Sequence, residues 1–275
     1  MKSDEKKTIR LPSGRVVPAI GLGMWYFGED AGAYYRETAL IRRALEIGYR
    51  VFDTAGLYGG GGAEEVLGEA VADVRKQVFL TSKVSPEGAS YEKIVESCDK
   101  SLERLQTDYL DMYLLHWRSA CEACFDDILE AFRDLKNDGK IRDFGVSNFG
   151  LTDLKDWYSH AGARGTAMNQ AYFNLVHRRV ERGLLPYCRK KKIPLVAYAP
   201  SDVYPSAYEN DVLKRIARQK DASPQQTALA WLFAQENIGV LVKAPTEDAL
   251  KSCFSSQSVA LTRTEAAELD AAFPV

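Results

Sequence analysis

Four side chains in the first half of the sequence could together deliver a proton to a carbonyl oxygen. They are a carboxylate, a phenol, an amine and an imidazole: Asp53, Tyr58, Lys83 and His116. A tyrosine with an ordinary pKa near about 10 donates its proton slowly at neutral pH. A buried ammonium about 4 Å from the phenol would favour the phenolate by roughly 4 kcal/mol at an effective dielectric constant of about 20. Because one pKa unit corresponds to about 1.36 kcal/mol, Lys83 is expected to lower the pKa of Tyr58 by up to about three units.

The aspartate and the histidine would complete this set. Asp53 would keep the desolvated lysine ammonium charged, and His116 would hydrogen-bond a carbonyl oxygen and orient it. We therefore expect the four residues to protonate a carbonyl oxygen while another group attacks its carbon. Taken singly, each residue also has an ordinary structural role, such as loop capping for Asp53 or packing for Tyr58. Their shared position in the predicted fold favours the catalytic role.

Short apolar runs alternate with segments of helical periodicity along the chain. Several runs are apolar on both faces, as parallel strands covered by helices are. Eight βα units in about 250 residues predict an α/β fold of the (β/α)8 TIM barrel class, with a doubly wound sheet as the alternative. The predicted strands are Ala19–Gly21, Arg50–Asp53, Val78–Lys83, Tyr109–His116, Asp143–Ser147, Ala167–Gln170, Pro194–Tyr198 and Gly239–Lys243.

Polar residues stand at the carboxyl ends of most predicted strands, where barrel enzymes place their chemistry. Tyr58 lies five residues beyond Asp53, on the loop after the second predicted strand. These side chains are therefore expected to meet at one end of the barrel. The strand-end residues are Asp53, Lys83, His116, Ser147 with Asn148, Asn169 with Gln170, Tyr198 and Lys243.

Local patterns place further elements around the barrel. Residues 8–18 are expected to form a β-hairpin around a Pro-Ser-Gly turn. Ser223-Pro-Gln-Gln226 has the Ser, Pro and Gln of a helix start. Because no linker or change in composition interrupts the chain, we expect a single domain over residues 1–275.

The glycines at positions 59 to 62 do not have the spacing of a phosphate-binding loop. A G-x-G-x-x-G pattern begun at Gly60 meets Glu65 where the third glycine is required, and no Gly-Lys-Ser or Gly-Lys-Thr occurs in the chain. The run is expected to be a flexible loop beside Tyr58. The looseness of this loop is expected to control how readily a ligand reaches Tyr58.

Composition excludes several classes of partner. The net charge is −2 and the sequence contains no block of basic residues, so nucleic acid is not an expected partner. The polar first residues, MKSDEKKTIR, are not expected to form a secretory signal, and no apolar run approaches the length of a membrane span. Five scattered cysteines favour free thiols in a reducing, cytoplasmic compartment. A lone CxxC, Cys121 to Cys124, is expected to be two ordinary cysteines near a helix start, and no metal site is predicted.

Several longer motifs occur along the chain in order. With these motifs, the sequence closely resembles the aldo-keto reductases nearly from end to end. It is most similar to bacterial members of that family described as methylglyoxal reductases. The resemblance implies that Tyr58 is the general acid, that Lys83 and Asp53 lower its pKa, and that His116 orients the substrate carbonyl. The motifs are GLGMW at Gly21–Trp25, GYRVFDTA at Gly48–Ala55, DYLDMYLLHW at Asp108–Trp117, IRDFGVSNF at Ile141–Phe149, MNQAYFNL at Met168–Leu175 and LVAYAP at Leu195–Pro200.

The resemblance also implies a nicotinamide dinucleotide cofactor. Ser147, Asn148 and Gln170 match residues that bind the carboxamide, and Tyr198 matches the aromatic residue that stacks on the nicotinamide ring. In the same way, Gly23, Met24 and Trp25 match the loop beneath the centre of the cofactor, and Asp53 is also expected to contact the cofactor. The implied substrate pocket is formed by Trp25, Tyr58, His116 and Trp117.

The segment after the last predicted strand departs from NADPH-preferring relatives. Lys243 is kept, but Ala244, Ala249 and Cys253 stand where the resemblance predicts Ser, Arg and Asn. An Arg fork is the usual tight ligand of a phosphate. The absence of this arginine weakens the case for a strong NADPH preference, but Lys243 and Thr246 remain to hold a phosphate. We expect NADPH as the cofactor, with Lys243 on its phosphate, and NADH as the alternative.

In the aldo-keto reductases that the sequence resembles, three segments shape the substrate pocket, and all three are short here: residues 118–122, residues 201–208 and the C-terminal region. The resemblance therefore implies an open and shallow substrate site. Such a site suits small aldehydes, ketones and dicarbonyls such as methylglyoxal, and the protein is expected to be a monomer. Two alternatives use the same barrel. One is a nucleotide-binding regulatory or sensor subunit, and the other is a lyase that forms a Schiff base on Lys83.

Overall fold

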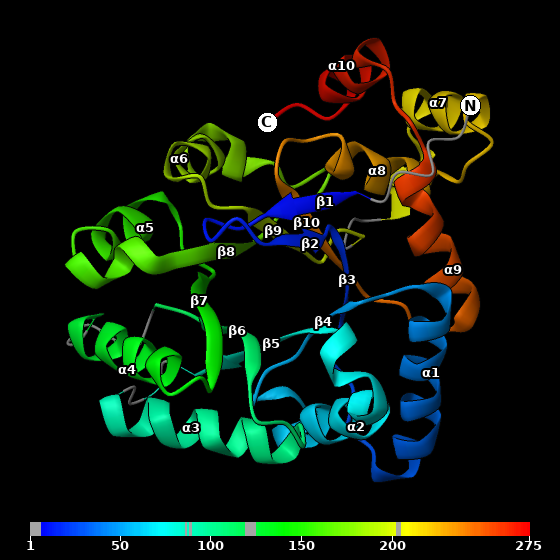
Figure 1. Ribbon diagram of the computed structural model, residues 1–275. Helices are drawn as coiled ribbons and strands as arrows, with labels where there is room; N and C mark the ends of the chain where they lie inside the picture. The colour runs from blue at the N-terminus through cyan, green and yellow to red at the C-terminus, as the bar shows by residue number, and fades with distance from the viewer. Residues whose placement is uncertain (1–6, 86, 88–89, 119–124, 202–204) are drawn as a thin grey trace.

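The computed structural model describes residues 7–85, 87, 90–118, 125–201 and 205–275. Within them, eight parallel strands close into a barrel that is surrounded by helices (Figure 1). Each strand pairs with the next strand along the chain, and the last pairs with the first. This confirms the predicted (β/α)8 barrel. The barrel strands are β3 (Ile20–Gly23), β4 (Val51–Asp53), β5 (Phe79–Val84), β6 (Leu110–Leu115), β7 (Ile141–Ser147), β8 (Thr166–Tyr172), β9 (Leu195–Tyr198) and β10 (Ile238–Val242).

The predicted carboxyl ends of β4, β7 and β9 agree with the structure, and the other strand ends differ by one or two residues. Lys83 is the second-last residue of β5, and His116 follows the last residue of β6. Asn169 and Gln170 lie inside β8, which continues to Tyr172. Every residue of β5 and β6 is buried, because the barrel interior covers one face and the helices cover the other.

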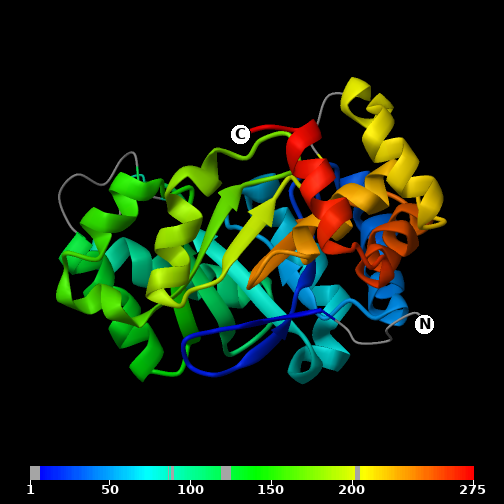
Figure 2. The same cartoon turned by 90° about the horizontal axis from the view of Figure 1, so that it is seen from above.

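The helices begin where the sequence supplies caps. In α8, Ser223 accepts from the backbone of Gln226, and the Gln226 side chain accepts from the backbone of Ser223. Figure 2 shows α7 and α10 side by side outside the barrel, where Arg215 pairs with Glu268. The helices are α1 (Tyr34–Ile47), α2 (Gly62–Val71), α3 (Tyr91–Arg104), α4 (Phe125–Asn137), α5 (Leu151–Trp157), α6 (Leu184–Lys191), α7 (Asp211–Gln219), α8 (Pro224–Phe233), α9 (Glu247–Ser255) and α10 (Arg263–Ala272).

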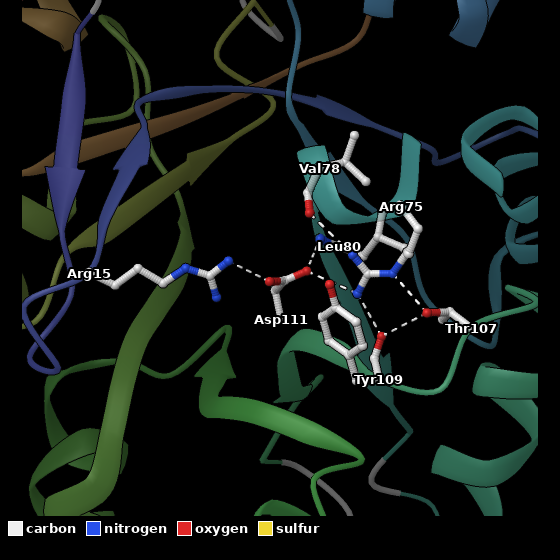
Figure 3. A network of polar contacts seen from close by, with 7 residues as sticks. All are labelled: Arg15, Arg75, Val78, Leu80, Thr107, Tyr109 and Asp111. Carbon is white, nitrogen blue, oxygen red and sulfur yellow. Dashed lines mark hydrogen bonds and ion pairs between the residues drawn. The ribbon is translucent and has the colours of Figure 1, made fainter. Parts of the chain in front are cut away.

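The predicted hairpin covers the amino-terminal ends of the strands. Its two strands, β1 (Thr8–Arg10) and β2 (Val16–Pro18), are antiparallel and bury Ile9 and Val17 in the core. Between them, the guanidinium of Arg15 forms an ion pair with the buried carboxylate of Asp111 in β6, with 2.5 Å between Nη2 and Oδ1 (Figure 3). The hairpin therefore closes the barrel at the end opposite the strand-end residues predicted to carry the chemistry.

Candidate active site

The structure brings Asp53, Tyr58 and Lys83 together at the carboxyl ends of β4 and β5. Asp53 and Lys83 are buried, and their carboxylate and ammonium groups form an ion pair. The Lys83 Nζ also donates to the backbone oxygen of Thr54 at 2.8 Å and to the hydroxyl of Tyr58 at 3.2 Å. All three protons of the ammonium thus have an acceptor. Sequence reasoning missed Thr54, because a backbone acceptor leaves no signal in the residue type.

The ammonium of Lys83 keeps its charge in this buried position. Burial by itself lowers the pKa of Lys83, but the charge of Asp53 and the phenol of Tyr58 together raise that pKa above its ordinary value. The lysine is therefore a permanent cation at neutral pH, fixed against the tyrosine hydroxyl.

The pKa of Tyr58 differs in direction from the sequence expectation. Burial raises the pKa of the phenol, and the opposing effect of Lys83 does not overcome it. The expectation that the pKa of Tyr58 falls below 10 was based on the cation alone. It left out the free-energy cost of forming a phenolate in a half-buried position. Tyr58 is consequently a protonated phenol at neutral pH, with a cation already in place for the phenolate that forms when it gives up its proton.

His116 lies beside Tyr58, with the two rings in an edge-to-face arrangement and their centroids 5.7 Å apart. Burial, with a smaller contribution from Lys83, lowers the pKa of His116 to about 2, so the imidazole is neutral. Its Nδ1 atom is buried and has no hydrogen-bond partner among the described residues. Trp117 stacks on the imidazole at a centroid distance of 3.6 Å. The arrangement holds a neutral, hydrogen-bonding ring next to the phenol.

The amide residues predicted to bind the cofactor form a network of their own. The Asn148 side chain donates to the backbone oxygen of His116 at 3.0 Å and accepts from the Tyr198 hydroxyl at 2.6 Å. Its amide nitrogen also donates to Ser147 Oγ at 3.2 Å. Gln170 donates to the second carboxylate oxygen of Asp53 at 2.5 Å. The structure therefore joins Ser147, Asn148 and Tyr198 to His116, and Gln170 to the ion pair.

Asn169, which lies beside Gln170 in β8, does not belong to this network. It is fully buried and donates to the backbone oxygen of Phe149 at 3.0 Å.

An aromatic stack lies above β3 and β10 at the same end of the barrel. Trp25 is 53% exposed and stacks on Tyr26 with a centroid distance of 4.7 Å. The Lys243 ammonium lies 3.8 Å from the centroid of the Tyr26 ring. Sequence reasoning missed Tyr26, although it directly follows the GLGMW motif. Gly23 ends β3, and Met24 is fully buried, so its side chain packs in the core.

The glycine turn after Tyr58 is closely packed, contrary to the predicted looseness. Gly59, Gly60 and Gly61 all have positive φ angles. A Cβ on Gly59 would lie 2.6 Å from the backbone oxygen of Gly28, and one on Gly62 would lie 2.4 Å from the same atom. Glycine is required here for a left-handed turn and for close backbone contact, so the turn fixes Tyr58 in place.

These residues fit a nicotinamide dinucleotide. The orphaned Nδ1 atom of the buried His116, the half-buried ring of Tyr198 and the amide groups beside it supply hydrogen-bonding groups and a flat face at one end of the site. Lys243 supplies a cation beside Tyr26, and no ion pair among the described residues involves it. The sequence departures Ala244 and Ala249 leave the start of α9 without an arginine.

Two other kinds of feature are absent from the described residues. These residues contain no group of three or more His, Cys, Asp and Glu side chains placed to hold a metal ion. None of their helices has both the length and the apolar character that a membrane crossing requires. Cys121 and Cys124 lie outside the described residues, whereas Cys98 and Cys188 are buried free thiols.

Comparison with known proteins places this geometry in a family. The sequence model of the Aldo/keto reductase family matches residues 19–202. Methylglyoxal reductase YeaE of Escherichia coli (strain K12) is 37% identical over 274 residues, covering 98% of this chain and 96% of that protein. Glyoxal reductase of Bacillus subtilis (strain 168) is 35% identical over 234 residues, covering 84% of this chain and 80% of that protein.

A solved structure agrees with the sequence matches. The crystal structure of an aldo/keto reductase from Klebsiella pneumoniae in complex with NADP and acetate has a TM-score of 0.93 and 36% sequence identity, covering 98% of this chain and 96% of that one. The barrel and the sequence matches therefore agree, and the chain belongs to the aldo/keto reductase family.

Proposed function

We propose that the protein reduces small aldehydes, ketones and dicarbonyls to alcohols with NADPH, methylglyoxal being the representative substrate. NADH is the alternative cofactor. The observation that carries this proposal is the 3.2 Å contact between the Tyr58 hydroxyl and the buried Lys83 ammonium, with the neutral His116 beside it. The family, the relatives that are methylglyoxal and glyoxal reductases, and the neighbour solved with NADP support the same activity.

In the proposed reaction, His116 and Tyr58 hydrogen-bond the carbonyl oxygen of the substrate. The reduced nicotinamide, when bound, supplies a hydride to the carbonyl carbon. As negative charge develops on the oxygen, the phenol proton of Tyr58 passes to it and gives the alcohol. Lys83 stabilises the resulting phenolate, and Asp53 fixes Lys83 in position.

The cofactor would be held by the residues that the site brings together. Ser147, Asn148, Gln170 and Tyr198 would hold the nicotinamide end, and Lys243 the phosphate end. Asp53, Gly23, Met24 and Trp25 would lie beneath the centre of the cofactor. Trp25 and Trp117, with Tyr58 and His116, would line the substrate pocket.

The ion pair of Lys83 weighs against a Schiff-base lyase on this barrel. A lysine nucleophile must be neutral and free, whereas Lys83 is charged and donates to three acceptors. The full set of Asp53, Tyr58, Lys83 and His116 weighs against a purely regulatory subunit.

We further propose that residues 1–275 form one domain that acts as a cytoplasmic monomer without a nucleic-acid partner. The continuous barrel supports the first point. The free thiols of Cys98, Cys188 and Cys253, none of which is paired in a disulfide, support a reducing compartment. A net charge of −2 supports the absence of nucleic acid.

A direct assay tests the proposed activity. The loss of NADPH absorbance is followed with methylglyoxal and with a nitrobenzaldehyde, for the wild type and for Tyr58→Phe. Turnover by the wild type that is lost in the variant supports the proposal. No turnover of either aldehyde with NADPH or NADH would overturn it.

A further inference from the structure

A fully buried carboxylate lies behind the tyrosine turn, and the proposed reaction does not use it. Glu64 is in the first turn of α2 and has no exposed surface, whereas the adjacent Glu65 is exposed. A buried charge is costly unless it is fully paired. Glu64 has a partner for each of its two carboxylate oxygens.

One oxygen of Glu64 holds the strand that carries Lys83. Glu64 Oε1 accepts a hydrogen bond from Ser82 Oγ at 2.5 Å, and both side chains are fully buried. Successive side chains of a strand point to opposite faces. Ser82 therefore points toward the helices while Lys83, the next residue in β5, points into the barrel.

The other oxygen of Glu64 holds the turn that carries Tyr58, through an arginine. Glu64 Oε2 accepts from Nε of Arg104, the last residue of α3, at 2.6 Å. A Cβ built on Gly61 would lie 2.7 Å from Arg104 Cδ, and one on Gly56 would lie 3.3 Å from Arg104 Nη2. The arginine thus packs against the chain on both sides of Tyr58.

We propose that Glu64, with Ser82 and Arg104, is a positioning unit that sets the contact between the Tyr58 hydroxyl and the Lys83 ammonium. Tyr58 and Lys83 are 25 residues apart and belong to different elements. Glu64 links both elements through its two oxygens. The inference rests on the proposed function, in which that contact supports proton transfer.

The chain contains a matched carboxylate at the other end of the barrel. Asp111 is also buried, and it pairs with Arg15 at 2.5 Å and with Arg75 at 3.0 Å (Figure 3). It accepts as well from the backbone of Leu80 at 3.0 Å. Asp111→Asn therefore removes a similar buried charge away from Tyr58, and it measures what the loss of an ion-paired carboxylate does to the fold alone.

The test compares Glu64→Gln with Asp111→Asn. Thermal unfolding is measured for both, followed by kcat and KM for methylglyoxal with NADPH below both unfolding transitions. Because a displacement of about 1 Å can cost about 100-fold in rate, Glu64→Gln is expected to lower kcat by about 10- to 100-fold with little change in KM. Asp111→Asn is expected to lower the unfolding temperature while kcat stays at the wild-type value.

A second variant covers the case in which Glu64→Gln does not fold. Ser82→Ala removes only the hydrogen bond to the Lys83 strand and leaves the Glu64–Arg104 pair in place. It is expected to lower kcat with little change in KM, by less than Glu64→Gln does. A wild-type kcat in either variant, or a loss of kcat in Asp111→Asn equal to that in Glu64→Gln, overturns the inference.

A measurement without turnover separates this inference from the proposed function. Tyrosine labelled with ¹³C at Cζ gives a resonance for Tyr58, which is assigned by its loss in Tyr58→Phe. We expect this resonance to move at neutral pH in Glu64→Gln or Ser82→Ala and to stay in place in Asp111→Asn. If it stays in place in all three, the positioning unit is wrong even if Tyr58 is the acid. If the wild type reduces no carbonyl, the proposed function is wrong while the resonance still decides the positioning.

Discussion

The hydroxyl of Tyr58 lies 3.2 Å from the ammonium of Lys83, and yet burial holds the pKa of the phenol above its ordinary value. Both observations are compatible with Tyr58 as the proton donor in carbonyl reduction. The tyrosine keeps its proton until a substrate oxygen takes it, and the cation acts on the phenolate that remains. Lys83 therefore matters most as the charge on the substrate oxygen develops, when such preorganised groups contribute most to rate.

Lys83→Met should separate the catalytic role of the cation from its structural role. The variant leaves Asp53 buried without its partner, which is expected to cost about 3–5 kcal/mol of unfolding free energy. It should also lower kcat by at least about 100-fold. The double variant Lys83→Met/Asp53→Asn should recover most of the stability and none of the activity. Urea unfolding and the methylglyoxal assay measure the two effects, and recovery of activity in the double variant would contradict the assigned role.

His116 should make the protein less stable as the pH falls below about 6.5. The folded state binds a proton on His116 only near pH 2, whereas the unfolded chain binds it below about 6.5. The unfolded state thus gains protons first, and stability falls by up to about 1.4 kcal/mol per pH unit in this window. In His116→Asn this part of the pH dependence should disappear, while the control variant His160→Asn should keep it. Chemical unfolding between pH 5 and pH 7 measures the slope, and equal slopes in wild type and His116→Asn would refute the assignment.

Two neighbouring glycines test whether the turn after Tyr58 is packed or loose. Gly59 and Gly60 have similar positive φ angles of 57° and 63°, but only a Cβ on Gly59 would clash with backbone. Gly60→Ala should cost only the strain of a left-handed residue, about 1–2 kcal/mol. Gly59→Ala should cost about 1–3 kcal/mol more, because the added methyl group overpacks the contact with Gly28, and it should also lower kcat. Equal unfolding free energies and equal kcat values for the two variants would favour the loose turn.

Lys243 and Ala249 should control the choice between NADPH and NADH. Hydrogen bonds to charged groups contribute about 1.5–3 kcal/mol, so Lys243→Ala should weaken NADPH binding by about 10- to 100-fold. NADH binding should change much less, because NADH lacks the phosphate. Ala249→Arg, at the start of α9, should tighten NADPH binding and leave NADH unchanged. Fluorescence titration with both dinucleotides checks this, and equal losses for the two in Lys243→Ala would contradict a phosphate contact.

The barrel was predictable from the sequence. The periodicity of the apolar residues indicates which faces of the strands are covered, and the number of predicted strands matches a (β/α)8 barrel. The hairpin at residues 8–18 and the helix start at Ser223 were also predicted, since both depend on local turn and cap residues. The ends of β5 and β8 were not, because ladder hydrogen bonds continue as far as the neighbouring strands allow. Lys83, Asn169 and Gln170 consequently lie within strands.

The candidate site was predictable as a set of residues and less so as a set of interactions. Residue type and strand position bring Asp53, Tyr58, Lys83 and His116 together. The direction of the Tyr58 pKa could not be read from residue types, because it depends on how burial and the nearby cation balance. The packed glycines depend on contact with Gly28, which lies on a different loop, and the use of the Thr54 carbonyl depends on backbone geometry.

The most direct test of the central claim is the rate of methylglyoxal reduction by Tyr58→Phe, with NADPH affinity measured separately by fluorescence. The variant keeps the ring and loses only the hydroxyl, so NADPH should bind with unchanged affinity. A general acid typically contributes about 10²- to 10⁴-fold in rate, and kcat should fall by that factor. Reduction at the wild-type rate by a variant that lacks this hydroxyl would contradict the role of Tyr58 as the proton donor.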